Sequence, residues 1–162
     1  MNISPWSRIF PSLLLGLAAV ACSRNPSAPV VPVPSEILAA PTEIVVGSSA
    51  LRLTTYFWRD FQPGSSTDTR LLAQLQIRAA AGEALPSALV VEKAWLILAD
   101  QAWLSTPRQE GPPSGAGSVA YMLRGGPEWP VGALVTAVIQ LRDAGNNSYF
   151  LRASPQAIQR TD

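Results

Sequence analysis

The side chains that most often carry enzymatic chemistry are scarce in this chain. It has no histidine and a single cysteine, Cys22. Without histidine, the chain lacks the commonest general base, the commonest metal ligand and the side chain that titrates near neutral pH. Composition therefore excludes Ser-His-Asp and Cys-His catalytic sites and metal sites built on imidazole. We expect no catalytic residues, no metal site and no cofactor.

Carboxylates are the remaining groups that could act as acids or bases. A glycosidase needs two of them, held about 5–10 Å apart in one cleft. Aspartate commonly occupies turns because its side chain accepts hydrogen bonds from nearby backbone amides. We therefore expect the acidic residues of turns and loops to be structural, and a hydrolase that uses two of them is the alternative. These residues are Asp60, Asp68, Asp100, Glu110 and Asp143.

The segment from Asp143 to Asn147 holds several oxygen-bearing side chains. Asp143, Asn146 and Asn147 could offer oxygen ligands to Ca²⁺. No EF-hand loop or glycine-aspartate repeat accompanies them. The segment is more typical of a turn, since Asp, Asn and Gly tolerate turn conformations or bond to their own backbone.

Aromatic side chains are the best candidates for a binding surface. Tyr56, Phe57 and Trp58 are consecutive, and Trp103 and Trp129 adjoin predicted loops. Because successive strand residues point to opposite faces, the three consecutive aromatics cannot all enter one core. Exposed aromatics beside arginine are common in interfaces. We therefore select Trp58, Trp103 and Trp129 as candidate binding residues; the alternative is that they fill a second apolar core beneath the loops.

The chain that positions these residues begins with an apolar stretch. Arg8 is the only charged residue before the run from Ile9 to Ala21, which ends in small residues. A basic start, a short apolar run and a small-residue cleavage site are typical of an export signal. The run is shorter than the roughly 20 residues that a membrane-spanning helix needs. Residues 1–21 are therefore predicted to be a signal peptide.

The residues at the predicted cleavage site resemble the lipobox of bacterial lipoproteins. Ala19-Val20-Ala21 directly precedes Cys22, although the commonest lipobox has leucine where Ala19 stands. The resemblance implies that Cys22 becomes the acylated N-terminus, which anchors the protein in a membrane. Ser23 stands where aspartate often causes retention in the inner membrane, which implies the outer membrane and its periplasmic side. The alternative is a secreted protein with a free thiol.

Residues 22–42 are predicted to be a tether. Five prolines occur between residues 23 and 42, and proline lacks a backbone donor and disfavours both helix and sheet. An extended proline-rich chain rises about 3.1 Å per residue, so this segment could hold a domain on the order of 50–60 Å from the membrane. Ile37 and Leu38 form the apolar pair that could already pack on the domain.

From Glu43 onward, short runs of residues alternate between apolar and polar, which is typical of half-buried strands. Turn residues at 143–147 join two such runs as a β-hairpin. Seven to eight strands predict one all-β domain, an antiparallel β-sandwich over residues 43–162. The clearest predicted inward positions are Leu51, Leu53 and Phe57, then Leu71, Ala73, Leu75 and Ile77, and finally Val135, Ala137, Ile139 and Leu141.

The C-terminal pattern resembles the last two strands of bacterial immunoglobulin-like and fibronectin-III-like domains. The resemblance rests on Trp129, the run 133–142, the turn after Asp143, and the inward positions Tyr149 and Leu151. It implies an immunoglobulin-like sandwich, in which Trp95 would be the buried tryptophan of an early strand.

Charge and composition favour a non-enzymatic role. After Cys22 the chain holds 11 basic and 11 acidic residues, so it offers no basic surface for nucleic acid. We expect a lipid-anchored, non-enzymatic protein of the bacterial cell envelope that acts as an interaction or structural module, with an envelope protein or a glycan as its partner. The alternatives are a carbohydrate- or peptidoglycan-binding module that uses exposed aromatics, and an assembly factor of a secretion or appendage complex.

Overall fold

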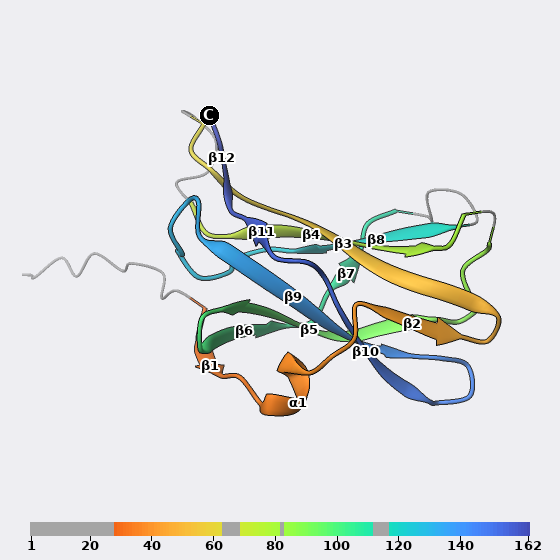
Figure 1. Ribbon diagram of the computed structural model, residues 1–162. Coiled ribbons are helices and arrows are strands. Elements are labelled where there is room, and N and C mark those ends of the chain that lie inside the picture. The colour runs from red at the N-terminus through yellow and green to blue at the C-terminus, as the bar shows by residue number, and fades with distance from the viewer. Residues whose placement is uncertain (1–27, 63–68, 82, 112–116) are drawn as a thin grey trace, which may run out of the picture.

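The computed structural model describes residues 28–62, 69–81, 83–111 and 117–162. The predicted signal peptide, Cys22 and Asp68 lie outside these residues. The described chain forms twelve strands and one short helix, α1 (Ser35–Leu38), and its strands build two sheets (Figure 1). The fold is therefore an all-β sandwich, as the alternation of apolar and polar residues predicts.

The first sheet, which we call the β9 sheet, contains six strands. Its order is β1 (Val30–Pro32), β6 (Gln101–Ser105), β5 (Val90–Leu98), β9 (Leu134–Arg142) and β10 (Ser148–Arg152), with β11 (Gln156–Ala157) also paired to β9. All of its neighbouring strands are antiparallel. The predicted hairpin of residues 133–153 is β9 with β10, joined by the turn after Asp143.

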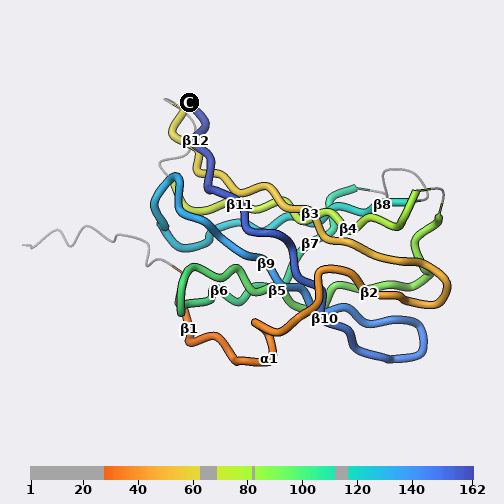
Figure 2. Tube along the Cα trace, in the orientation of Figure 1, coloured from red at the N-terminus to blue at the C-terminus, as the bar shows by residue number. Residues whose placement is uncertain are grey.

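The second sheet, which we call the β3 sheet, also contains six strands. Its order is β12 (Gln159–Thr161), β3 (Ser49–Asp60), β4 (Leu72–Ala79), β8 (Ser118–Leu123) and β7 (Arg108–Gln109), with β2 (Glu43–Val46) also paired to β3. Its pairs are antiparallel except that β12 runs parallel to β3. Figure 2 shows this C-terminal segment beside the end of β3.

The predicted count of seven to eight strands is too low, because the described residues contain twelve. Seven strands have five or more residues: β3, β4, β5, β6, β8, β9 and β10. The other five have two to four residues. Of these, β1 and β7 lie in segments predicted to be tether and loop, where two or three residues show no alternating pattern, so only their pairing partners reveal them.

The core lies between the two sheets and is lined by the positions that alternation predicts. Burial of each large apolar side chain contributes about 1.5–3 kcal/mol, so this core holds the sheets together without a disulfide. Tyr149, also predicted to point inward, is only partly buried. The other predicted inward side chains are at most 5% exposed: Leu51, Leu53, Phe57, Leu71, Ala73, Leu75, Ile77, Val135, Ala137, Ile139, Leu141 and Leu151.

A second apolar cluster covers the outer face of the β9 sheet. Residues 28–42, which we call the N-terminal strap, cross this face with β1 paired to β6 and Ile37 of α1 only 2% exposed. The backbone amide of Arg152 donates to the carbonyl of Pro41 at 2.7 Å. This part of the predicted tether is therefore packed on the sandwich, because Ile37 buries apolar surface against Trp95 and its neighbours.

Trp95 belongs to this outer cluster, although the immunoglobulin-like resemblance implied a place in an early strand of the core. On β5, Ala94 and Leu96 face the core between the sheets, so Trp95 points to the opposite face. There it is 8% exposed and packs edge-on against Phe150, with ring centroids 5.9 Å apart. Trp95 therefore helps to hold the strap.

Candidate binding surface

Two of the three candidate tryptophans are part of the core. Trp103 is 4% exposed and Trp129 is 7% exposed, and both belong to the apolar cluster between the sheets. Trp103 packs so closely on the loop before β9 that a Cβ atom on Gly126 would lie 2.6 Å from its ring. Neither tryptophan offers a ring face to a ligand, so the prediction that they are exposed binding residues is wrong.

Trp58 lies on the outer face of the β3 sheet together with Tyr56. Phe57, between them, is fully buried in the core, so both neighbours point away from it. Tyr56 is 46% exposed and Trp58 is partly exposed. Their ring centroids lie 5.3 Å apart with 30° between the planes. Together they form a pair of adjacent aromatic rings on the outer face of the β3 sheet, with Leu72 opposite Trp58.

Strand register brings further side chains beside this pair. Tyr56 lies opposite Gln74 of β4, Gln74 opposite Met122 of β8, and Met122 opposite Arg108 of β7. Directly paired residues have Cβ atoms about 4.5–5.5 Å apart, so these four form one row across the sheet. We call this surface the aromatic face and define it by the residues Tyr56, Trp58, Gln74, Gln76, Arg78, Arg108 and Met122.

The aromatic face has more positive than negative charge available. Arg78 donates from Nε and Nη2 to Gln76 Oε1, at 3.1 and 2.8 Å, rather than to a carboxylate. Across the described part of the chain, neither Arg78 nor Arg108 forms an ion pair. The nearby Arg124 differs, because its Nη2 lies 2.9 Å from Glu110 Oε1.

Sequence reasoning identified Trp58 but did not select Tyr56, Gln74, Gln76, Arg78 or Arg108. Alternation around a buried Phe57 could have identified Tyr56, since it must share the face of Trp58. The others could not have been found, because their places on this face depend on strand register. The β3–β4 register sets Gln74, Gln76 and Arg78 opposite Tyr56, Thr54 and Arg52, and Arg108 joins the row only through three successive pairings.

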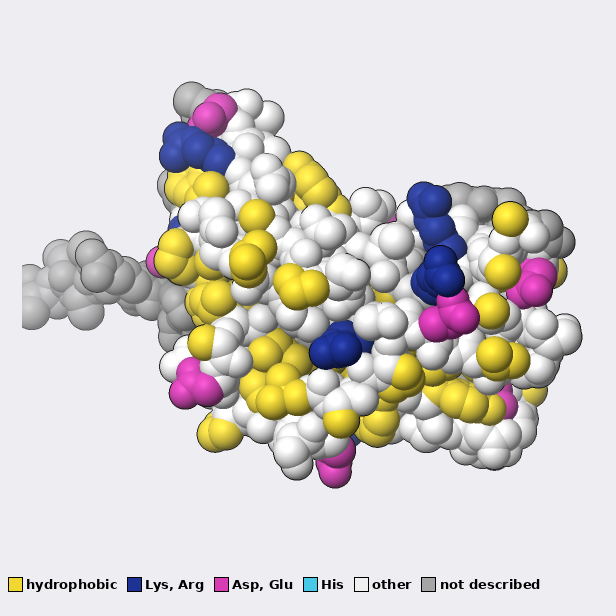
Figure 3. Space-filling model, viewed as in Figure 1, with side chains coloured by type: hydrophobic (Ala, Val, Ile, Leu, Met, Phe, Trp, Pro, Cys, Tyr) yellow, Lys and Arg dark blue, Asp and Glu magenta, His cyan; other side chains and the backbone are white. Residues whose placement is uncertain are grey.

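On the face of the molecule shown in Figure 3, positively and negatively charged side chains are mixed, which agrees with the balanced composition.

A separate aromatic-cation cluster lies at the end of β3. The guanidinium carbons of Arg59 and Arg160 are 5.1 and 4.4 Å from the ring centroid of Phe61. Arg59 Nη1 donates to the carbonyl of Trp129 at 3.1 Å. Arg160 Nη2 lies 2.7 Å from Asp162 Oδ1, and this hydrogen bond lowers the pKa of the Asp162 carboxyl. These contacts hold chain segments together and engage both arginines.

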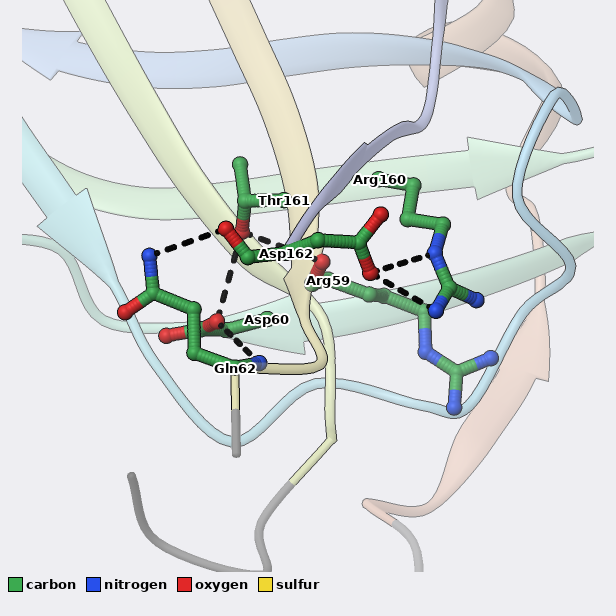
Figure 4. Close-up of polar contacts among 6 residues, drawn as sticks. All are labelled: Arg59, Asp60, Gln62, Arg160, Thr161 and Asp162. Atoms are coloured by element: carbon green, nitrogen blue, oxygen red, sulfur yellow. Dashed lines mark hydrogen bonds and ion pairs between the residues drawn. The ribbon is translucent and has the colours of Figure 1, made fainter. Parts of the chain in front are cut away.

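Figure 4 shows the polar bonds that join the same two segments. The Thr161 hydroxyl donates to the carbonyl of Arg59 at 3.3 Å, and the amide of Gln62 donates to Asp60 Oδ1 at 3.0 Å. Asp60, one of the candidate acids, is thus engaged with the backbone that follows it. We infer that this cluster fastens β12 to β3.

Asp143 is saturated by donors of its own turn. Its Oδ1 accepts from the amides of Gly145 and Asn147 at 2.8 and 2.9 Å, and its Oδ2 accepts from Asn147 Nδ2 and the Tyr149 hydroxyl at 3.0 and 2.9 Å. These bonds, those from Asn147 above all, lower the pKa of the Asp143 carboxyl. Such a carboxylate is suited to holding the hairpin turn and poorly suited to general-acid catalysis.

The other candidate carboxylates do not assemble a site. Glu110 is paired with Arg124, and Asp100 is exposed in the turn between β5 and β6. Within the ranges that the structure describes, no three His, Cys, Asp or Glu side chains come together in a way that could hold a metal ion.

A groove of about 510 Å³ lies at the end of the sandwich that carries the β9–β10 turn, lined by residues 46–49, 83–87 and 143–145. Its two carboxylates, Glu83 and Asp143, and the Ser49 hydroxyl already have partners. Glu83 Oε2 accepts from the amide of Ala50 at 3.0 Å, and the Ser49 hydroxyl donates to the carbonyl of Ala84 at 2.9 Å. The groove therefore has fewer free recognition groups than the aromatic face.

In the described part of the chain, no helix is long and apolar enough to cross a membrane.

No protein-family model, curated protein or solved structure matches this chain.

Proposed function

We propose that the protein is a lipid-anchored, non-enzymatic interaction module of the bacterial cell envelope. The observation that carries this proposal is that one outer sheet face is covered by the chain itself and the other is not. The N-terminal strap covers the face of the β9 sheet, whereas the β3 sheet leaves an aromatic pair, Tyr56 and Trp58, partly exposed. Tryptophan, tyrosine and arginine are the residue types enriched among those that anchor protein contacts.

Anchoring at Cys22 is supported by its lipobox-like context and by its being the only cysteine. Because the described fold already begins at Ala28, only residues 23–27 separate it from Cys22. Six Cα–Cα steps span about 20 Å at most. The domain would then sit close to the membrane surface, and the stand-off of 50–60 Å inferred from proline content would not apply.

We further propose that the sandwich is immunoglobulin-like. Among the seven long strands in chain order, the first, second and fifth share the β3 sheet, while the fourth, third, sixth and seventh follow one another across the β9 sheet. This distribution supports a Greek-key sandwich of that class. The outward position of Trp95 is the main departure from the pattern.

Metabolic labelling with an alkyne fatty acid, followed by membrane fractionation, tests the anchor. We expect the wild-type protein to be labelled and membrane-bound, and Cys22→Ala to be unlabelled and released. Ser23→Ala is the matched control and should remain labelled. A Cys22→Ala protein that stays firmly in the membrane fraction would refute anchoring through Cys22.

Site-specific photocrosslinking in the intact envelope tests the interaction surface. A photoreactive phenylalanine analogue at Tyr56 should yield a discrete adduct. The same analogue at Val131, which is similarly exposed at 42%, should not. Equal adducts at both positions, or none at Tyr56, would argue against the aromatic face as the interaction surface.

A further inference from the structure

We propose that the aromatic face binds a peptidoglycan strand, with sugar rings on Tyr56 and Trp58 and a peptide carboxylate on Arg78 or Arg108. This inference rests on the proposed function, because it names the partner of the same interaction module. The partner is a glycan that carries carboxylates, which fits the shape, polarity and charge of the face.

Shape is the first argument. Tyr56 and Trp58 are neighbours on the outer face of the β3 sheet, with ring centroids 5.3 Å apart and 30° between the tilted planes. A pyranose ring has an apolar face of C–H groups, which is suited to an aromatic surface. Tyrosine and tryptophan present large rigid areas at low entropic cost, so two adjacent rings can seat neighbouring sugars of one chain.

Polarity is the second argument. Gln74 lies directly opposite Tyr56 and is exposed, so its amide is free to reach groups bound over that ring. A primary amide both donates and accepts hydrogen bonds. Sugar hydroxyls and acetamido groups need both functions at once. The side chain opposite Tyr56 therefore suits a hydroxyl-rich ligand better than a purely apolar one.

Charge is the third argument. Arg78 and Arg108 have no carboxylate partner among the described residues, while the nearby Arg124 is paired with Glu110. Guanidinium groups that have no ion-pair partner complement anionic ligands on a binding surface and can bind carboxylates with two parallel hydrogen bonds. A neutral polysaccharide would leave these charges unused, whereas the peptide stems of peptidoglycan supply carboxylates.

Distance between these groups indicates an extended ligand. Arg108 lies three strands away from Tyr56 along one row of the sheet. At about 4.8 Å between neighbouring strands, the two positions are roughly 14 Å apart. A single sugar cannot reach both, but a glycan with an attached peptide can.

The test uses the purified, lipidated protein in mild detergent, with isolated peptidoglycan sacculi in a sedimentation assay and soluble strand fragments in a tryptophan-fluorescence titration. We expect saturable binding to both. Tyr56→Ala and Trp58→Ala should each weaken binding about tenfold, which corresponds to about 1.4 kcal/mol. Trp58→Phe should retain most of the affinity because a ring remains.

Charge variants test the role of the carboxylates. Arg78→Gln and Arg108→Gln should weaken binding several-fold, while Arg124→Gln is the matched control and should leave it unchanged. Neutral chitin oligosaccharides, which have the amino-sugar backbone without peptides, should bind at least tenfold more weakly than the strand fragments. Equal affinity for chitin would overturn the carboxylate contact.

Three results would overturn the proposal as a whole. The first is that the protein does not bind sacculi. The second is that Tyr56→Ala and Trp58→Ala bind as well as the wild type while their thermal unfolding is also unchanged. The third is that the protein binds lipopolysaccharide more tightly than peptidoglycan. Because the assay measures ligand binding by purified protein, its failure is distinct from a failure of lipid anchoring, which fractionation of Cys22→Ala detects.

Discussion

A Cβ atom placed on Gly126 would lie 2.6 Å from Cζ3 and 2.8 Å from Cε3 of Trp103. The amide of Gly126 also donates to the carbonyl of Leu71 at 3.0 Å, which fixes the loop against the core. The ring of Trp103 therefore occupies the space that any other residue at position 126 would need. This contact explains how a tryptophan beside predicted loops becomes buried.

Gly126→Ala is expected to lower the free energy of unfolding by about 1–3 kcal/mol, the usual cost of forcing extra volume into a packed site. Denaturant titration followed by circular dichroism measures this. Trp103→Phe replaces the indole by a smaller ring and should relieve the contact. In the Trp103→Phe protein, Gly126→Ala should therefore lower the unfolding free energy by less, and a double-mutant cycle measures the difference. Equal costs in both backgrounds would mean that the ring contact is not responsible.

Adjacent threonines on β3 provide a matched pair for testing a buried polar group. The hydroxyl oxygen of Thr55 is buried and has no hydrogen-bond partner among the described residues. Thr54, on the outer face, donates to the carbonyl of Gln76 at 3.4 Å. Thr55→Val should stabilise the fold by about 1 kcal/mol, because it removes an unsatisfied hydroxyl from the core.

Thr54→Val is the control for this effect and should change the unfolding free energy by less than about 0.5 kcal/mol. Both substitutions replace a hydroxyl by a methyl group on a β-branched side chain, so a general strand preference for valine would stabilise both variants equally. If both variants raise the unfolding temperature equally, the effect comes from strand propensity and not from removal of the buried hydroxyl.

Asp143 should make stability depend on pH in the acid range. Hydrogen bonds from Asn147, Tyr149 and Gly145 lower its pKa in the folded state. The folded state then binds a proton less readily than the unfolded state. Its stabilising contribution is present above the usual aspartate pKa and is lost as the pH falls through the lowered folded value.

Asp143→Asn should accordingly flatten the decline of the unfolding temperature between about pH 5 and pH 2. Calorimetry at several pH values checks this. A smaller slope remains, because the Asp162 carboxyl also has a lowered pKa, caused by Arg160. Asp100→Asn, in the exposed β5–β6 turn, is the control; if it flattens the curve as much as Asp143→Asn, the turn contacts are not the cause.

Neighbouring residues of α1 test whether the N-terminal strap belongs to the domain. Ile37 points from the strap onto the β9 sheet and is 2% exposed, whereas Leu38 is 49% exposed. Ile37→Ala should lower the unfolding free energy by about 2–4 kcal/mol, since it leaves a cavity against Trp95. Leu38→Ala should change it by less than about 0.5 kcal/mol.

Tryptophan fluorescence and hydrogen exchange distinguish local release of the strap from global unfolding. In Ile37→Ala, the emission of Trp95 should shift toward that of exposed tryptophan, and amides of residues 28–42 should exchange faster. If both variants behave like the wild type, the strap contributes nothing measurable to the domain.

The strands of the core could be predicted because their pattern is local. Leu75 and Ile77, like Val135 and Ala137, alternate with polar or partly exposed neighbours, and a two-residue period reveals an inward face without knowledge of the partner strand. The hairpin turn after Asp143 is likewise encoded in consecutive residues. Short strands such as β1 and β7 could not be predicted, because they consist of only a few pairings to a neighbour.

By itself, the sequence determined the class of fold, the buried face of each long strand, and the absence of histidine chemistry. Tertiary structure decided which aromatics are exposed, because the burial of Trp103 depends on Gly126 and Leu71, both distant in the chain. It also decided that Ile37 docks, since its site exists only after the β9 sheet has formed. Arg108 and Tyr56 share a face for the same reason: register between strands is a long-range property, whereas alternation within a strand is a local one.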